Sequence, residues 1–139
     1  MKTRVLDSWA ILEWMRGREP AMNVVAQLLA EAEQGAARLF MSAMNVGEVY
    51  YFLHKHESVE LAEAWRAVSR TLPVTIEVPG ADDIWHAAAL KARFPIAYAD
   101  AFAAALAQKH QCPLVTGDPE FRVVTHLELH WIGRGARQH

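Results

Sequence analysis

The stretch PLVTGDPEF, residues 113–121, joins a short apolar run to an acidic turn. The run LVT is typical of a buried strand, and the glycine and proline on either side of the acid predict that the strand ends there. Asp118 therefore falls where a strand stops and a turn begins. Side chains at the carboxyl ends of parallel strands point into the crevice where such sheets bind ligands, so Asp118 is a candidate site residue.

The rest of the chain alternates strand and helix patterns around this stretch. Strands are expected at residues 4–7, 37–41, 73–78, 113–116 and 126–132. The first four are apolar enough to be buried on both faces, whereas the last alternates apolar and polar residues like an edge strand. Helices are expected after Pro20 and from Ser42, Ser58, Asp82 and Asp100.

This order of elements predicts the fold class. Strands that alternate with helices imply crossover connections and parallel pairing, with helices on both faces of the sheet. We expect an α/β protein, a three-layer α/β/α sandwich with a central, mainly parallel sheet of about five strands. Its 139 residues fit a single domain, residues 1–139.

Composition excludes several classes of protein. Hydrophobic residues make up 53% of the chain and charged residues 22%, which argues against disorder. No apolar run approaches the roughly 20 residues that cross a bilayer, and no signal-peptide core follows the N-terminus, so we expect a cytoplasmic protein without a membrane partner. Cys112 is the only cysteine, which excludes an internal disulfide and a cysteine-based zinc site.

The net charge of −2 gives no general attraction to nucleic acid, although a local basic patch stays possible. After Glu128 the only Lys or Arg residues are Arg134 and Arg137, and His139 ends the chain. This tail could contact phosphates, but a solvated terminus is the preferred interpretation.

The acidic residues form two populations. Most lie in polar helix faces or turns, where solvated charge is the ordinary explanation: Glu31, Glu33, Glu57, Glu60, Glu63 and Glu120. Four others interrupt apolar segments: Asp7, Glu48, Asp100 and Asp118.

Each of these four has its own structural context. Asp7 ends the first strand as Asp118 ends the fourth, and Asp100 begins an apolar helix. Asp7 and Asp100 could cap helices, and Asp118 could form an Asx turn. Glu48 is harder to explain, because it lies in an apolar helix with no Lys or Arg three or four residues away, and a buried carboxylate without a partner is unfavourable.

Four acids gathered at one edge of a sheet would repel one another unless they shared a cation. Oxygen ligands alone favour Mg²⁺ or Mn²⁺ over zinc. Such an ion activates water and stabilises charge on a leaving oxygen, so the pattern indicates metal-assisted phosphodiester hydrolysis.

Four blocks carry a family resemblance: VLDSWAIL at 5–12, NVGEVYY at 45–51, YADAFAAALA at 98–107 and LVTGDPEF at 114–121. In order and spacing they resemble the PIN-domain ribonucleases, specifically the VapC-type toxins of bacterial and archaeal toxin–antitoxin pairs. The resemblance runs from Val5 to about Ile132.

The resemblance implies site residues and a function. It assigns catalytic and metal-binding roles to Asp7, Glu48, Asp100 and Asp118, and accessory polar roles to Ser8 and Thr116. It implies an endoribonuclease that requires Mg²⁺ or Mn²⁺, acts as the toxin of a type II toxin–antitoxin system, forms a homodimer and is inhibited by a cognate antitoxin.

Two other classes were weighed against the nuclease. A phosphoaspartyl phosphatase would have a second Asp two residues after the first, where this chain has Trp9, and both it and a receiver domain need a lysine near the acids. A non-catalytic RNA- or protein-binding module on the same fold is the main alternative; the loss of one or more acids would mark it, and none is lost.

Overall fold

The computed structural model describes residues 1–135. Arg137 and His139 of the predicted tail lie outside these residues.

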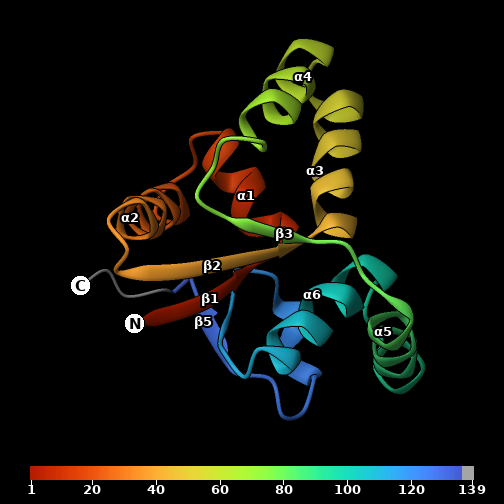
Figure 1. The fold of residues 1–139 in the computed structure, drawn as a ribbon. Helices are drawn as coiled ribbons and strands as arrows, with labels where there is room; N and C mark the ends of the chain where they lie inside the picture. Colours follow the sequence, from red (N-terminus) through yellow and green to blue (C-terminus); the bar gives the residue numbers. More distant parts are fainter. Residues whose placement is uncertain (136–139) are drawn as a thin grey trace.

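The centre of the molecule is a sheet of five strands, each parallel to its neighbours, in the order β3-β2-β1-β4-β5 (Figure 1). The strands are β1 (Lys2–Leu6), β2 (Ala37–Ser42), β3 (Thr75–Glu77), β4 (Leu114–Thr116) and β5 (Leu129–Trp131). The expected parallel five-stranded sheet is confirmed. Leu6 pairs with Val115, so the carboxyl ends of β1 and β4 lie side by side.

Helices cover both faces of the sheet, which confirms the three-layer α/β/α prediction (Figure 1). One face packs against α1 (Ser8–Met15), α2 (Ala21–Glu33), α3 (Ala43–His56) and α4 (Val59–Val68). The other packs against α5 (Ala81–Arg93), α6 (Tyr98–Lys109) and the short 3-10 helix η1 (Pro119–Val123).

Polar caps begin the helices that matter for the site. The Asp7 side chain caps α1, and the Ser42 side chain caps α3. Asp100 is not a cap, because α6 starts at its N-cap Ala97 and Asp100 lies within the first turn. The residues that follow, from Ala101 to Ala107, are all buried, and five of the seven are alanines.

Two strand predictions need correction. The third strand was expected to be buried on both faces, but Thr75 and Ile76 are exposed because β3 lies at the edge of the sheet. The last strand begins at Leu129 rather than at residue 126. His126 has a φ of 59°, a left-handed conformation that cannot be part of a strand. The place of β5 at the other edge, and its half-buried pattern, are as expected.

Across residues 1–135, no helix combines the length and the apolar character that a membrane span requires.

Candidate functional site

Acids from four separate parts of the chain meet at the carboxyl edge of the sheet. Asp7 directly follows β1, and Asp118 comes two residues after the adjacent β4. Glu48 lies on α3 and Asp100 on α6. Their charges act on one another: Asp118 and Glu48 raise the pKa of both Asp7 and Asp100. The structure therefore brings together all four acids that the sequence singled out.

Asp7 is the most deeply buried of these acids, with 1% of its surface exposed. Its Oδ1 accepts a hydrogen bond of 2.7 Å from the Ala10 amide, and its Oδ2 accepts one of 2.5 Å from the Thr116 hydroxyl. Burial raises the pKa of Asp7 to about 7 against the opposing effect of these two hydrogen bonds, and the negative charges of Asp118 and Glu48 raise it further.

Asp100 is half-buried in the first turn of α6. Loss of solvent raises its pKa to about 8, and the charges of Asp118, Glu48, Asp7 and Glu120 add to the effect in that order. With pKa values of about 7 and about 8, Asp7 is close to half-protonated at pH 7 and Asp100 favours the protonated form.

The Glu48 carboxylate is hydrogen-bonded to a neutral side chain rather than to Lys or Arg. The Ser8 hydroxyl, at the start of α1, donates a hydrogen bond to Oε1 of Glu48. The Asn45 side-chain amide donates to the Ser8 oxygen at 3.1 Å. These hydrogen bonds explain how the apolar helix α3 accommodates Glu48, although no Lys or Arg lies three or four residues away from it.

The turn after β4 fixes Asp118. The Asp118 amide donates to Oγ1 of Thr116 at 3.0 Å, and Oδ1 of Asp118 accepts from the Glu120 amide at 3.0 Å, which is the Asx turn considered from sequence. Gly117 between them cannot carry a side chain: a Cβ there would lie 2.3 Å from the Trp9 ring and 2.6 Å from the Gly133 Cα.

A fifth acid joins the cluster. Asp100, Asp118 and Glu120 each offer a carboxylate oxygen, and these three atoms lie within 4.8 Å of one another. The assignment of Glu120 to the solvated acids was incomplete, since it is exposed but lies next to the site. The sequence signal for this position of Glu120 is the Asp-Pro turn, because such a turn keeps the residues that follow Asp118 close to it.

The donor set fits a hard divalent cation. All candidate ligand atoms of this cluster are carboxylate oxygens, the preferred ligands of Mg²⁺ and Mn²⁺. The upward pKa shifts of Asp7 and Asp100 have the direction expected for buried carboxyl groups that lie close to other acids, an arrangement that a cation would stabilise.

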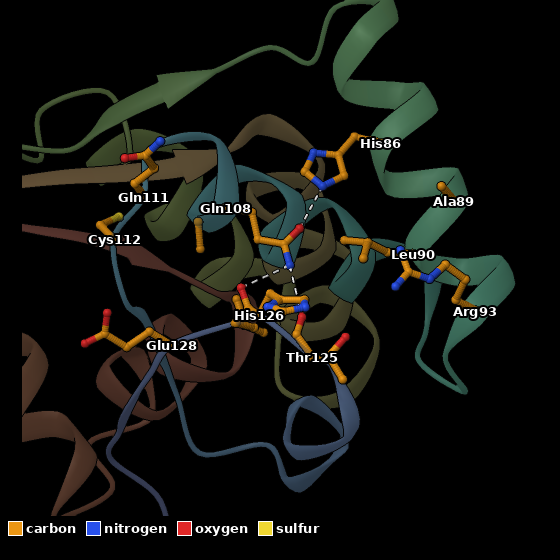
Figure 2. A pocket seen from close by; sticks show the side chains of 12 residues that line it. His86, Ala89, Leu90, Arg93, Gln108, Gln111, Cys112, Thr125, His126 and Glu128 are labelled. Atoms are coloured by element: carbon orange, nitrogen blue, oxygen red, sulfur yellow. Dashed lines mark hydrogen bonds between the residues drawn. The ribbon is translucent and has the colours of Figure 1, made fainter.

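A cavity of about 480 Å³ lies elsewhere, between α5, the second half of α6 and residues 125–128 (Figure 2). His86, Arg93 and His126 line it, and the Gln108 side chain bonds to His86 and to the carbonyls of residues 125 and 126 (Figure 2). None of the acids described above lines this cavity, so the candidate site is the open acidic edge of the sheet.

The fold and the site define a three-layer α/β protein with acids gathered at the carboxyl ends of its two adjacent inner strands. The chain belongs to the PIN domain family, since the family model described as "PIN domain" matches residues 4–127. The family inferred from the four sequence blocks is thereby confirmed.

Solved structures share this fold. VapC20 of Mycobacterium tuberculosis, described as a sarcin-ricin loop cleaving toxin, has a TM-score of 0.74 at 17% identity, over 91% of this chain and 98% of that one. VapBC2 of Rickettsia felis, bound to a DNA fragment from its promoter, has a TM-score of 0.71 at 16% identity, over 91% and 96%. VapBC-1 of nontypeable Haemophilus influenzae has a TM-score of 0.66 at 23% identity, over 93% and 97%. A search of the curated proteins gives no match to this chain.

Proposed function

We propose that this protein is a Mg²⁺- or Mn²⁺-dependent endoribonuclease and the toxin of a type II toxin–antitoxin pair. The observation that carries the proposal is the convergence of acids at the carboxyl edge of the sheet, where carboxylate oxygens of Asp100, Asp118 and Glu120 lie within 4.8 Å of one another. Burial, and then the charges of neighbouring acids, raise the pKa of Asp7 and Asp100 there. Acids this close need a cation to be ionised together, and a site this negative would repel RNA phosphates without one.

In this proposal Asp7, Asp100 and Asp118 hold the cation directly or through water, and Glu48 completes the site. A bound divalent ion supplies Lewis-acid stabilisation of the charge that develops on a phosphate and lowers the pKa of water. The protein's own groups arrange this chemistry. Thr116 orients Oδ2 of Asp7, and Ser8 orients Oε1 of Glu48.

The proposed nucleophile is water rather than a side chain. Both hydroxyl groups of the site donate to carboxylates, Ser8 to Glu48 and Thr116 to Asp7. Within residues 1–135, neither is paired with a histidine that would act as a base in the manner of a Ser-His relay. This pairing supports direct hydrolysis over a covalent intermediate.

The expected partners are RNA, a cognate antitoxin and a second copy of the chain, all in the cytoplasm. The structures of VapBC2 and VapBC-1 are the comparisons that favour an antitoxin partner. Self-association is favoured by large apolar side chains that are exposed along β3, the start of α5 and the connection between them: Ile76, Val78, Ile84 and Trp85.

RNA cleavage by the purified protein, freed of any antitoxin, tests the proposal. Cleavage should require Mg²⁺ or Mn²⁺, stop with EDTA, and fall by about 100-fold or more in Asp100→Asn and Asp118→Asn. The matched control is Glu60→Gln, which alters an exposed acid in the first turn of α4 and should leave cleavage unchanged. RNA binding without cleavage by the wild type would instead favour the non-catalytic binding module.

A further inference from the structure

Asn45 is buried beside the acids, with 0% of its surface exposed. It lies in the first turn of α3, three residues before Glu48, so both side chains share one face of the helix. Its Nδ2 atom lies 3.1 Å from the Ser8 oxygen, 3.1 Å from the Ala99 carbonyl and 3.4 Å from Oε1 of Glu48. One amide group therefore joins α1, α3 and α6.

The directions of these hydrogen bonds matter. The hydroxyl of Ser8 donates to Glu48, and the Ser8 oxygen accepts from Asn45. The bonds thus form a series that starts at the Asn45 amide and ends on the Glu48 carboxylate. The same amide also donates to the carbonyl of Ala99, the residue that precedes Asp100.

Among the residues that the structure describes, the other end of the Asn45 side chain has no hydrogen-bond partner. Its Oδ1 atom is buried and accepts no hydrogen bond from residues 1–135. A buried carbonyl without a donor is unfavourable, and an apolar residue of similar size would avoid that penalty. An amide at this position is therefore justified by what its NH₂ group does, not by packing.

The acids oppose their own assembly. Glu48 lies on α3, Asp100 on α6 and Asp118 in the turn after β4, and carboxylate oxygens of Asp100 and Asp118 lie within 4.8 Å of each other, so like charges on these elements repel when the acids are ionised. The Asn45 amide links α3, which carries Glu48, to the first turn of α6, which carries Asp100.

We infer that Asn45 is a positioning residue of the acidic site. Its amide holds Glu48 and the first turn of α6 in the arrangement that a divalent cation requires, and thereby sets the affinity for that ion. This inference rests on the proposed function, because it concerns the same cation.

Asn45→Leu tests the inference, because it keeps the approximate size of the side chain while it removes the donors and the unpartnered oxygen. Isothermal titration calorimetry with Mn²⁺ should give an affinity about 10- to 100-fold below that of the wild type, the range typical for residues that orient metal ligands. Thermal unfolding without metal should change little. An unchanged Mn²⁺ affinity in folded Asn45→Leu would overturn the inference.

Trp65→Phe is the matched control. It removes a hydrogen bond of 3.0 Å from the Trp65 indole on α4 to the Val46 carbonyl on α3, the helix that carries Asn45 and Glu48. It should lower thermal stability and leave Mn²⁺ affinity as in the wild type. An equal loss of affinity in both variants would mean that α3 stability, rather than the amide, controls the site.

A double-mutant cycle separates positioning from general structure. If Asn45 acts through Glu48, Asn45→Leu should weaken Mn²⁺ binding less in a Glu48→Gln background than in the wild type. If the effects of Asn45→Leu and Glu48→Gln on Mn²⁺ affinity simply add, Asn45 does not act through Glu48. Should Asn45→Leu fail to fold, Ser8→Ala breaks the same series of bonds, and an unchanged Mn²⁺ affinity there would also overturn the inference.

The outcomes distinguish this inference from the proposed function. A wild-type protein that binds no Mn²⁺ would overturn both. A wild type that binds Mn²⁺ and cleaves RNA, with equal affinity in Asn45→Leu, would overturn only the role of Asn45.

Discussion

The hydroxyl of Thr116, at the end of β4, donates a hydrogen bond of 2.5 Å to Oδ2 of Asp7, the residue after β1. The same hydroxyl accepts the amide of Asp118 at 3.0 Å. One small side chain therefore fixes the two acids that follow the adjacent inner strands. The parallel pairing of β1 with β4 therefore sets how far apart Asp7 and Asp118 lie.

Thr116→Val should weaken the site without removing an acid. The hydrogen bond from Thr116 lowers the pKa of Asp7, so its loss should raise that pKa further and make Asp7 harder to ionise. We expect Mn²⁺ affinity, measured by calorimetry, to fall about 10- to 100-fold. Thr71→Val is the control, because it removes an exposed hydroxyl that bonds to the Val68 carbonyl outside the site. Equal affinities in Thr116→Val and the wild type would contradict this role.

The pH dependence of stability follows from the raised pKa values. In the metal-free protein these are about 7 for Asp7 and about 8 for Asp100, against about 3.9 in an unfolded chain. At a pH between the unfolded and the folded pKa values, Asp7 and Asp100 keep their protons in the folded state, whereas the unfolded chain has released them. The free energy of unfolding should therefore decrease as the pH rises from about 4 to about 8.

Divalent cations should reverse this trend, since they compete with the protons on the same carboxyl groups. Thermal unfolding with EDTA and with Mg²⁺ at about pH 5 and about pH 8 checks both statements. Mg²⁺ should raise the melting temperature mainly at the higher pH. In Asp100→Asn the metal-free protein should lose less stability with rising pH. A Mg²⁺ effect that is equal at both pH values would contradict the linkage.

Gly117 should be intolerant of a side chain. A Cβ would lie 2.3 Å from the Trp9 ring and 2.6 Å from the Gly133 Cα, so the turn that carries Asp118 must move. We expect Gly117→Ala to lower the free energy of unfolding by about 1–3 kcal/mol, the range for overpacked sites, and to weaken Mn²⁺ binding. Gly47→Ala, in α3 where nothing lies within 4 Å of the added Cβ, should instead stabilise the protein. Comparison of the two variants by urea unfolding checks this contrast.

Glu120 should contribute less than the four predicted acids. Its carboxylate lies with those of Asp100 and Asp118, but it is exposed, so solvent screens its charge. Glu120→Gln should weaken Mn²⁺ binding by only a few-fold, whereas Asp118→Asn should weaken it about 10- to 100-fold. A larger loss in Glu120→Gln than in Asp118→Asn would mean that the roles of the two acids are reversed.

Much of the fold could be predicted because its signals are local. Caps at Asp7, Ser42 and Ser58 and the Asx turn at Asp118 depend on residues two or three positions away, and the structure has all of them. The parallel pairing followed from the alternation of strands and helices.

The parts that sequence missed depend on distant contacts. The edge position of β3 depends on which strands pair, and its exposure could not be derived from its apolar composition. Asn45 passed unnoticed because its partners Ser8 and Ala99 are 37 and 54 positions away. Glu120 lies in a turn and is exposed, as expected of a solvated acid, but its position in the sequence does not show that it lies beside Asp100 and Asp118.

The central claim is that one divalent cation is held by acids from β1, α3, α6 and the turn after β4. A crystal of the protein soaked with Mn²⁺ tests it most directly, through the anomalous scattering of the metal. We expect an anomalous peak bounded by the carboxylates of Asp7, Asp100 and Asp118. A peak at any other position, or none at a Mn²⁺ concentration that supports RNA cleavage, would contradict it.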